Sequence, residues 1–235
     1  MARITRKELK TDKFALEVGQ TLSFFEEHRQ ELIRYGTAAI VVAALVFGFI
    51  SYRRHQKAAR EEALSRAIQV QETPVGPVAP GSPTTNNFPT QQVKDETAVK
   101  VFTDVRNKYP GTNEAEIAQY FLGAIRADQG NLAEAAKDFQ EVAQKGDQQY
   151  ASLAKLSLAQ VYFSQGKSQD GENLLRDLMA HPSMFVSKDQ AAITLARALL
   201  PTKPDESRKI LDSLRNQPTA AGQVALQMYS ELPPK

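Results

Sequence analysis

Side chains that could carry out chemistry are few in this sequence, and none has the spacing of a known site. The 235 residues include no cysteine, which excludes disulfides, thiolate metal ligands and a thiol nucleophile. The histidines at 28, 55 and 181 lie far apart, so they form no metal-binding pair. The acidic pairs Glu61–Glu62 and Asp95–Glu96 are adjacent in sequence and point away from each other on a helix. We therefore predict no catalytic residue, no metal and no cofactor, and a protein that is not an enzyme.

The charge distribution gives no sign of a nucleic-acid partner. The formal net charge is +2, from 29 basic and 27 acidic residues. Residues 91–235 hold 17 basic and 18 acidic residues and are therefore close to neutral. Nucleic-acid-binding surfaces need a clear excess of Lys and Arg. We expect neither a nucleic-acid partner nor a small-molecule substrate.

One uncharged apolar stretch, Tyr35–Tyr52, predicts a transmembrane helix. About 20 apolar helical residues span a bilayer, and the preceding Leu32 and Ile33 supply the missing length. Arg34 on one side and Arg53 on the other mark the ends of the stretch. A buried core helix would carry a polar stripe, and a cleaved signal peptide would carry a small-residue cleavage site. The stretch has neither feature.

The segments around this span have distinct compositions. Residues 1–34 form a basic tail followed by a predicted amphipathic helix, and residues 53–72 predict a helix that leaves the membrane. Residues 73–93 form a proline-rich linker in which four prolines recur at every third position. This period is typical of polyproline II and predicts a stiff spacer of about 30 Å. The alternative is a ligand for an aromatic-lined groove of another protein.

Residues 94–235 read as helices throughout and contain an internal repeat. Gly130 and Gly166, 36 residues apart, each follow an apolar helical segment. Leu122–Gly123 corresponds in the same register to Leu158–Ala159, and Ala135 and Phe139 correspond to Gly171 and Leu175. A repeat of this length with a glycine turn predicts pairs of antiparallel helices. We therefore predict an all-α fold.

These residues resemble the tetratricopeptide repeat, a helix-turn-helix unit of about 34 residues. The resemblance implies a right-handed stack of helical hairpins after the transmembrane helix, with degenerate units flanking the two clear ones. It also implies a concave face that binds proteins and is lined by the first helix of each hairpin. Carried over position by position, the binding residues are Tyr120, Ala124, Asp128, Gln160, Phe163 and Arg197. Packing of Tyr120 and Phe163 between helices is an equally open interpretation.

The whole layout also resembles the ancillary subunit of the bacterial Sec translocon. The stretches that carry this resemblance are FFEEHRQ before the span and YRRHQKAAREEALSRA after it. The resemblance implies a single-pass inner-membrane protein with its repeats in the periplasm. Its partners there would be the translocon, periplasmic chaperones or emerging chains.

Three hypotheses about function follow. The first is this membrane-anchored interaction module of the cell envelope. The second is a similar scaffold that faces the cytoplasm and recruits soluble partners. The third is an envelope enzyme or a carbohydrate-binding protein of the envelope. The basic residues close to the span lie mostly on its C-terminal side, which by the positive-inside rule favours a cytoplasmic repeat domain. However, long folded domains cross the membrane largely regardless of charge. The resemblance to the Sec translocon subunit therefore decides, and we expect the repeat domain to lie in the periplasm.

Overall fold

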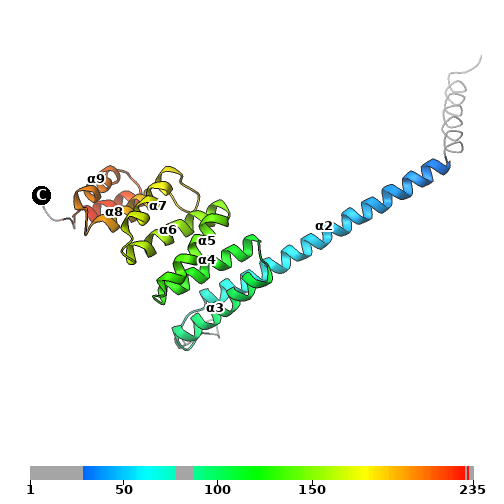
Figure 1. Ribbon diagram of the computed structural model, residues 1–235, viewed down its shortest axis with the longest axis horizontal. Helices are drawn as coiled ribbons and strands as arrows, with labels where there is room; N and C mark the ends of the chain where they lie inside the picture. The colour runs from blue at the N-terminus through cyan, green and yellow to red at the C-terminus, as the bar shows by residue number, and fades with distance from the viewer. Residues whose placement is uncertain (1–28, 78–86, 231, 233–235) are drawn as a thin grey trace, which may run out of the picture. The chain divides into compact units, whose positions relative to one another are not determined.

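The computed structural model describes residues 29–77, 87–230 and 232, and all the regular elements in these ranges are helices (Figure 1). The predicted all-α class is confirmed. The predicted amphipathic helix before the span falls mainly on residues 1–28, outside the described residues. The helices of the described ranges are α2 (Arg29–Glu72), α3 (Gln91–Lys108), α4 (Asn113–Asp128), α5 (Leu132–Lys145), α6 (Gln148–Ser164), α7 (Ser168–Ala180), α8 (Lys188–Leu199), α9 (Pro204–Leu214) and α10 (Ala220–Ser230).

Contacts within the chain divide it into two units, Met1–Ala58 and Ala59–Lys235. The described part of the first unit is the beginning of α2. Its apolar stretch has a mean hydropathy of 2.0, and none of it is buried against other described residues. The hydroxyl of Thr37 donates to the carbonyl of Ile33 at 2.7 Å, so this polar group is satisfied within the helix. The helix is therefore long and apolar enough to cross a membrane.

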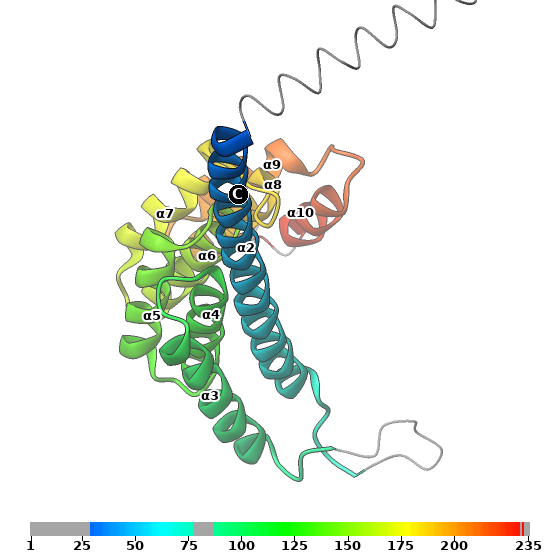
Figure 2. The same ribbon diagram turned by 90° about the vertical axis from the view of Figure 1, so that its right-hand side faces the viewer.

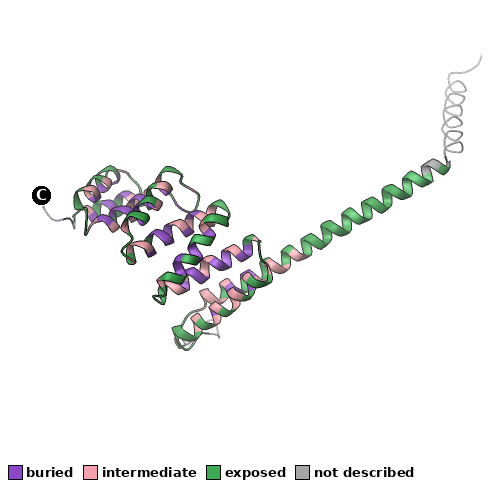
Figure 3. Ribbon diagram, viewed as in Figure 1, coloured by how far each residue is buried: buried purple, intermediate pink, exposed green. Residues whose placement is uncertain are grey.

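The second unit is a stack of helical hairpins. The pairs α4–α5, α6–α7 and α8–α9 form three hairpins, and each helix also packs against the next one along the chain. The first helices α4 and α6 contact each other, as do α8 and the terminal helix α10. Figure 2 shows α5 and α7 on one side, with α4 and α6 beside them. Buried positions follow the stack from α3 to α10 (Figure 3).

Glycine turns close the first two hairpins in the same way. Gly130 has φ 78° and Gly166 has φ 77°, in the left-handed region that glycine adopts without strain. The amide of Asn131 donates to the carbonyl of Arg126 at 2.8 Å, and Lys167 repeats this bond to Tyr162 at 2.8 Å. These bonds satisfy carbonyls at the end of each first helix. The predicted turns at both glycines are confirmed.

The two helices of each hairpin approach closely where a small residue faces a large one. A Cβ atom at Gly123 would lie 2.9 Å from Cε1 of Phe139, so any larger residue there would force the Phe139 ring to shift. At the equivalent positions of the second hairpin, Ala159 faces a smaller partner, Leu175, and both are fully buried. The first hairpin therefore pairs the smallest residue with a large ring, and the second pairs a slightly larger residue with a smaller side chain.

Substituting Gly123→Ala is expected to lower the free energy of unfolding by about 1–3 kcal/mol, because the added methyl overpacks the hairpin against Phe139. The double variant Gly123→Ala, Phe139→Leu recreates the pair found in the second hairpin. It should be more stable than the sum of the two single effects predicts. Urea unfolding of the four proteins gives this coupling energy, and strictly additive effects would contradict the packing described.

Glu172 ties the second hairpin to the third. Its carboxylate is buried and accepts hydrogen bonds from Lys203 Nζ at 2.7 Å and from Arg176 Nη2 at 3.0 Å. Burial alone would raise the pKa of Glu172, but the hydrogen bonds and charges of Lys203 and Arg176 outweigh burial and lower it. The ionised carboxylate therefore stabilises the native state above its unfolded pKa, and this contribution disappears as the pH falls through the lower native pKa.

Glu172→Gln is accordingly expected to lower the free energy of unfolding by about 1–3 kcal/mol at neutral pH. The difference from the original chain should shrink as the pH falls below the ordinary value of 4.5. Urea unfolding at neutral and acidic pH tests this. A difference that stays constant, or grows, as the solution is acidified would contradict the assigned role of Glu172.

The C-terminal part of α2 is the first helix of an additional hairpin, with α3 as the second. Leu64 and Ala67 on α2 are buried in one core cluster with Ala98 and Phe102 of α3. Nε of Arg60 also lies 3.3 Å from the carboxylate of Glu114 on α4. This confirms that the segment after the apolar stretch is helical, and it gives the degenerate first repeat its missing helix.

The predicted 30 Å spacer is wrong. The two ends of the proline-rich segment pair with each other, because Gly76 donates its amide to the carbonyl of Phe88 at 2.9 Å and Phe88 donates to Pro74 at 3.0 Å. The described ends of the segment therefore lie side by side, and α2 and α3 pack in one core cluster. The proline period could not reveal this, because the pairing of the two ends depends on α2 and α3 packing together.

Candidate protein-binding surface

The two aromatic residues predicted to bind a partner pack largely between helices. The Tyr120 ring lies 5.6 Å from the Phe139 ring, and its hydroxyl is 3.5 Å from that of Ser157 on α6. Phe163 fills the space beside Gly171, where a Cβ atom would lie 2.8 Å from the Phe163 ring. Both side chains are half-buried. Packing between helices therefore accounts for the position of Phe163. Tyr120 packs in the same way and also belongs to a larger group of aromatic rings.

The other four predicted residues separate into one core residue and three exposed polar ones. Ala124 is half-buried beside Tyr120 in the core cluster around Phe139. Asp128, Gln160 and Arg197 are exposed in the last two turns of α4, α6 and α8 respectively. They are placed where a partner could reach them.

A continuous series of aromatic rings, here called the aromatic strip, crosses the domain from α3 to the loop before α8. Its members are Phe102, Phe121, Tyr120, Tyr150 and Phe185. Successive ring centroids lie 4.9, 5.7, 5.8 and 5.7 Å apart. The first ring is fully buried, the next three are half-buried and the last is 42% exposed. Pairs of rings at these distances favour one another by about 0.5–1.5 kcal/mol beyond the area they bury, so the strip is a stable feature.

The exposed end of the strip is a short loop that hydrogen bonds hold in place. The hydroxyl of Ser183 accepts from the amides of Phe185 at 3.2 Å and Val186 at 3.0 Å. The amide of Met184 donates to the side-chain oxygen of Gln149, on α6, at 3.1 Å. Val186 is fully buried and fixes the far end of the loop. Met184, 86% exposed, and Phe185 therefore project from a rigid support.

The acidic side chain of Asp147 lies beside the strip. Asp147 caps α6 and accepts from the amides of Gln149 and Tyr150 at 3.0 and 2.9 Å. Burial, followed by the charge of Asp147, raises the pKa of Glu116 and also that of the Tyr150 hydroxyl. Asp147 therefore places negative charge next to Tyr150 in the strip. A positively charged group near Tyr150 would be attracted there.

Sequence reasoning missed Met184 and Phe185. They stand between helices, where periodicity carries no information, and their support comes from α6, more than 30 residues earlier in the chain. The available signal was an adjacent pair of large apolar residues in a loop, where polar residues are usual.

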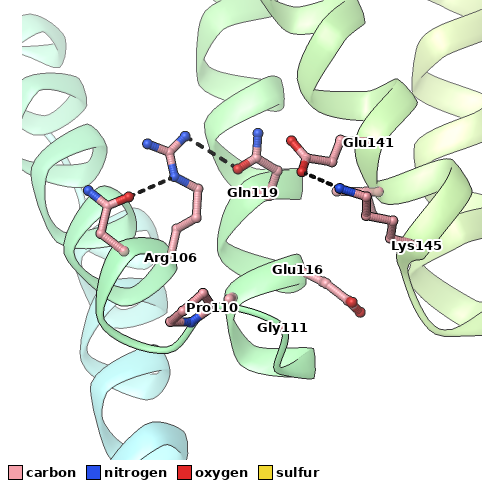
Figure 4. Close-up of a pocket in the computed structure, with 10 residues that line it drawn as sticks. Arg106, Pro110, Gly111, Glu116, Gln119, Glu141 and Lys145 are labelled. Carbon is pink, nitrogen blue, oxygen red and sulfur yellow. Dashed lines mark hydrogen bonds and ion pairs between the residues drawn. The ribbon is translucent and has the colours of Figure 1, made fainter.

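A separate pocket of about 470 Å³ lies among α3, α4 and α5 (Figure 4). Its polar side chains bind one another. Arg106 donates to Gln119 at 3.3 Å, and Lys145 donates to Glu141 at 3.0 Å. These pairings give no nucleophile next to a base. Within residues 29–77, 87–230 and 232, no group of three His, Asp or Glu side chains could hold a metal ion.

The family model of the tetratricopeptide repeat-like domain matches residues 23–212. The chain therefore belongs to the tetratricopeptide repeat-like family, whose domains generally bind proteins rather than catalyse reactions. The match includes all of α2 and α3, in agreement with the hairpin that these helices form. No curated protein matches the chain.

Proposed function

We propose that this chain is a membrane-anchored, non-enzymatic protein-interaction module that binds a partner polypeptide at the aromatic strip and the Met184–Phe185 loop. The observation that supports this most is a large apolar side chain, Met184, 86% exposed on a hydrogen-bonded loop next to aromatic rings. Large apolar groups held rigidly at a surface bind partners with little entropic cost, and such groups dominate binding energy in interfaces.

The surroundings of the strip specify the chemistry of the partner segment. Met184, Phe185 and the half-buried Tyr150 offer apolar surface, whereas Asp147 places negative charge beside Tyr150. The complementary segment carries apolar side chains flanked by a Lys or Arg. Asp128, Gln160 and Arg197 are proposed as additional polar contacts at the exposed ends of the first helices.

The stretch Tyr35–Tyr52 is the proposed anchor, because its length and exposure suit a single membrane span. The resemblance in layout to the ancillary subunit of the Sec translocon supports a bacterial inner membrane location with the repeats in the periplasm. Partners would then be the translocon, periplasmic chaperones or emerging chains. The alternative is a scaffold with its repeats in the cytoplasm. A periplasm-dependent reporter fused after Lys235 decides between them, since activity would reject the cytoplasmic orientation.

The double variant Met184→Ser, Phe185→Ser is expected to weaken partner binding by about 30-fold or more, because the loss of even one anchor in an interface costs about 2 kcal/mol. Its free energy of unfolding should fall by only about 1–2 kcal/mol, because Met184 is 86% exposed and Phe185 loses mainly its ring contact with Tyr150. Quantitative co-purification from membranes of the source cells, solubilised in mild detergent, measures the partner retained. The control is Val93→Ser, which removes a similarly exposed side chain from α3. Equal retention by the double variant and the control would contradict the assignment.

A further inference from the structure

Two arginines directly after the apolar stretch, Arg53 and Arg54, have no oxygen acceptor among the described residues. The side chains of Arg53 and Arg54 are exposed. The guanidinium carbon of Arg53 lies 5.7 Å from the centre of the Phe49 ring. Among the residues that the structure describes, no hydrogen bond or ion pair to an oxygen is found for either arginine. The other arginines of this helix beyond the stretch, Arg60 and Arg66, pair with Glu114 and Glu62.

The cation–π contact turns Arg53 back along the helix, towards the apolar stretch. Side chains on a helix lean towards its N-terminus, so a residue four positions earlier lies beside the guanidinium. Phe49 belongs to the apolar stretch and is 60% exposed. If this stretch lies in the bilayer, the guanidinium sits at the inner border of the headgroup layer. A positive charge at that depth is attracted to anionic lipid headgroups, which lie at the same level.

We propose that Arg53 and Arg54 form a binding site for the phosphate groups of anionic phospholipids. A guanidinium has five N–H donors arranged to bind phosphate oxygens in pairs. Successive residues on a helix point about 100° apart, so the two arginines cover a broad sector of one end of the span. Lys57, one turn after Arg53, adds positive charge near this sector. The inference rests on the proposed membrane anchor and extends it by naming the lipid class that the anchor selects.

The full chain in nanodiscs tests the site. One set of nanodiscs holds phosphatidylcholine alone, and the other holds equal amounts of phosphatidylcholine and phosphatidylglycerol. Native mass spectrometry of the released protein counts retained phosphatidylglycerol. The double variant Arg53→Gln, Arg54→Gln should lower the preference for phosphatidylglycerol over phosphatidylcholine roughly five- to thirty-fold. The control Arg66→Gln, which removes an arginine already paired with Glu62, should leave the preference unchanged.

The possible outcomes separate the site from the anchor. If the chain leaves the nanodisc fraction, the anchor itself is refuted, and the lipid site with it. If the chain stays but the arginine variant keeps the original preference, only the lipid site is overturned. Added inorganic phosphate should not reduce the retained phosphatidylglycerol, and displacement by it would assign the arginines to free phosphate instead of lipid.

Discussion

Replacing Ala67 by glutamate is expected to lower the free energy of unfolding of the repeat domain by about 4 kcal/mol or more. Ala67 has no exposed surface and packs among Leu64, Ala98 and Phe102. A carboxylate at this position would be buried without a partner or would push α2 away from α3. Urea unfolding of the full chain in detergent, followed by circular dichroism, measures the loss.

The matched control is Ser65→Glu. It adds the same charge to the same helix two residues earlier, on its exposed side. Its effect should stay within about 0.5 kcal/mol. If Ala67→Glu is tolerated as well as Ser65→Glu, then the end of α2 is not part of the repeat core. The proline-rich segment would then again be open to interpretation as a spacer.

Replacing Asp138 by alanine is expected to lower the free energy of unfolding by about 3–5 kcal/mol, because it breaks a buried network between α4 and α5. Asp138 on α5 accepts a hydrogen bond from Gln119 at 2.7 Å and forms an ion pair with Arg126. Burial raises the pKa of Asp138, and the charge and hydrogen bond of Arg126 oppose this rise. In the alanine variant the buried Gln119 amide loses its acceptor, and Arg126 loses its closest carboxylate. Urea unfolding measures the loss.

Two variants separate the network from the charge. Glu134→Ala removes the exposed partner of the same arginine, 3.5 Å away, and should cost no more than about 1 kcal/mol. Asp138→Asn keeps an oxygen that can accept from Gln119, so its cost should fall between those of the other two variants. Equal costs for Asp138→Ala and Glu134→Ala would show that burial of the network does not matter.

The hairpins could be predicted because their signals are local. Gly130 and Gly166 end helices through bonds that join residues only five positions apart, and such signals repeat along the chain. The small residue at Gly123 also has a local signature, since its counterpart, Ala159, lies one repeat later. Left-handed turns and close contacts between helices both require glycine or another small residue, so the sequence shows where they occur.

The features that escaped prediction depend on contacts distant in sequence. The proline period of residues 73–93 favours an extended segment, but burial of Leu64 and Ala67 against α3 outweighs that local preference. The sequence leaves open whether Tyr120 contacts a partner or packs between helices, and its packing is decided by Phe139 and Tyr150 on other helices. Met184 owes its position to Gln149. No local pattern encodes these partners.

Photo-crosslinking in living cells can show whether a partner binds at the exposed end of the aromatic strip. A photoreactive amino acid replaces Phe185 in the full chain, and a second protein carries it at Lys137, an exposed position on α5. We expect a discrete crosslinked partner from position 185 and none from position 137. The same partner captured equally from both positions, or from position 137 alone, would contradict this expectation.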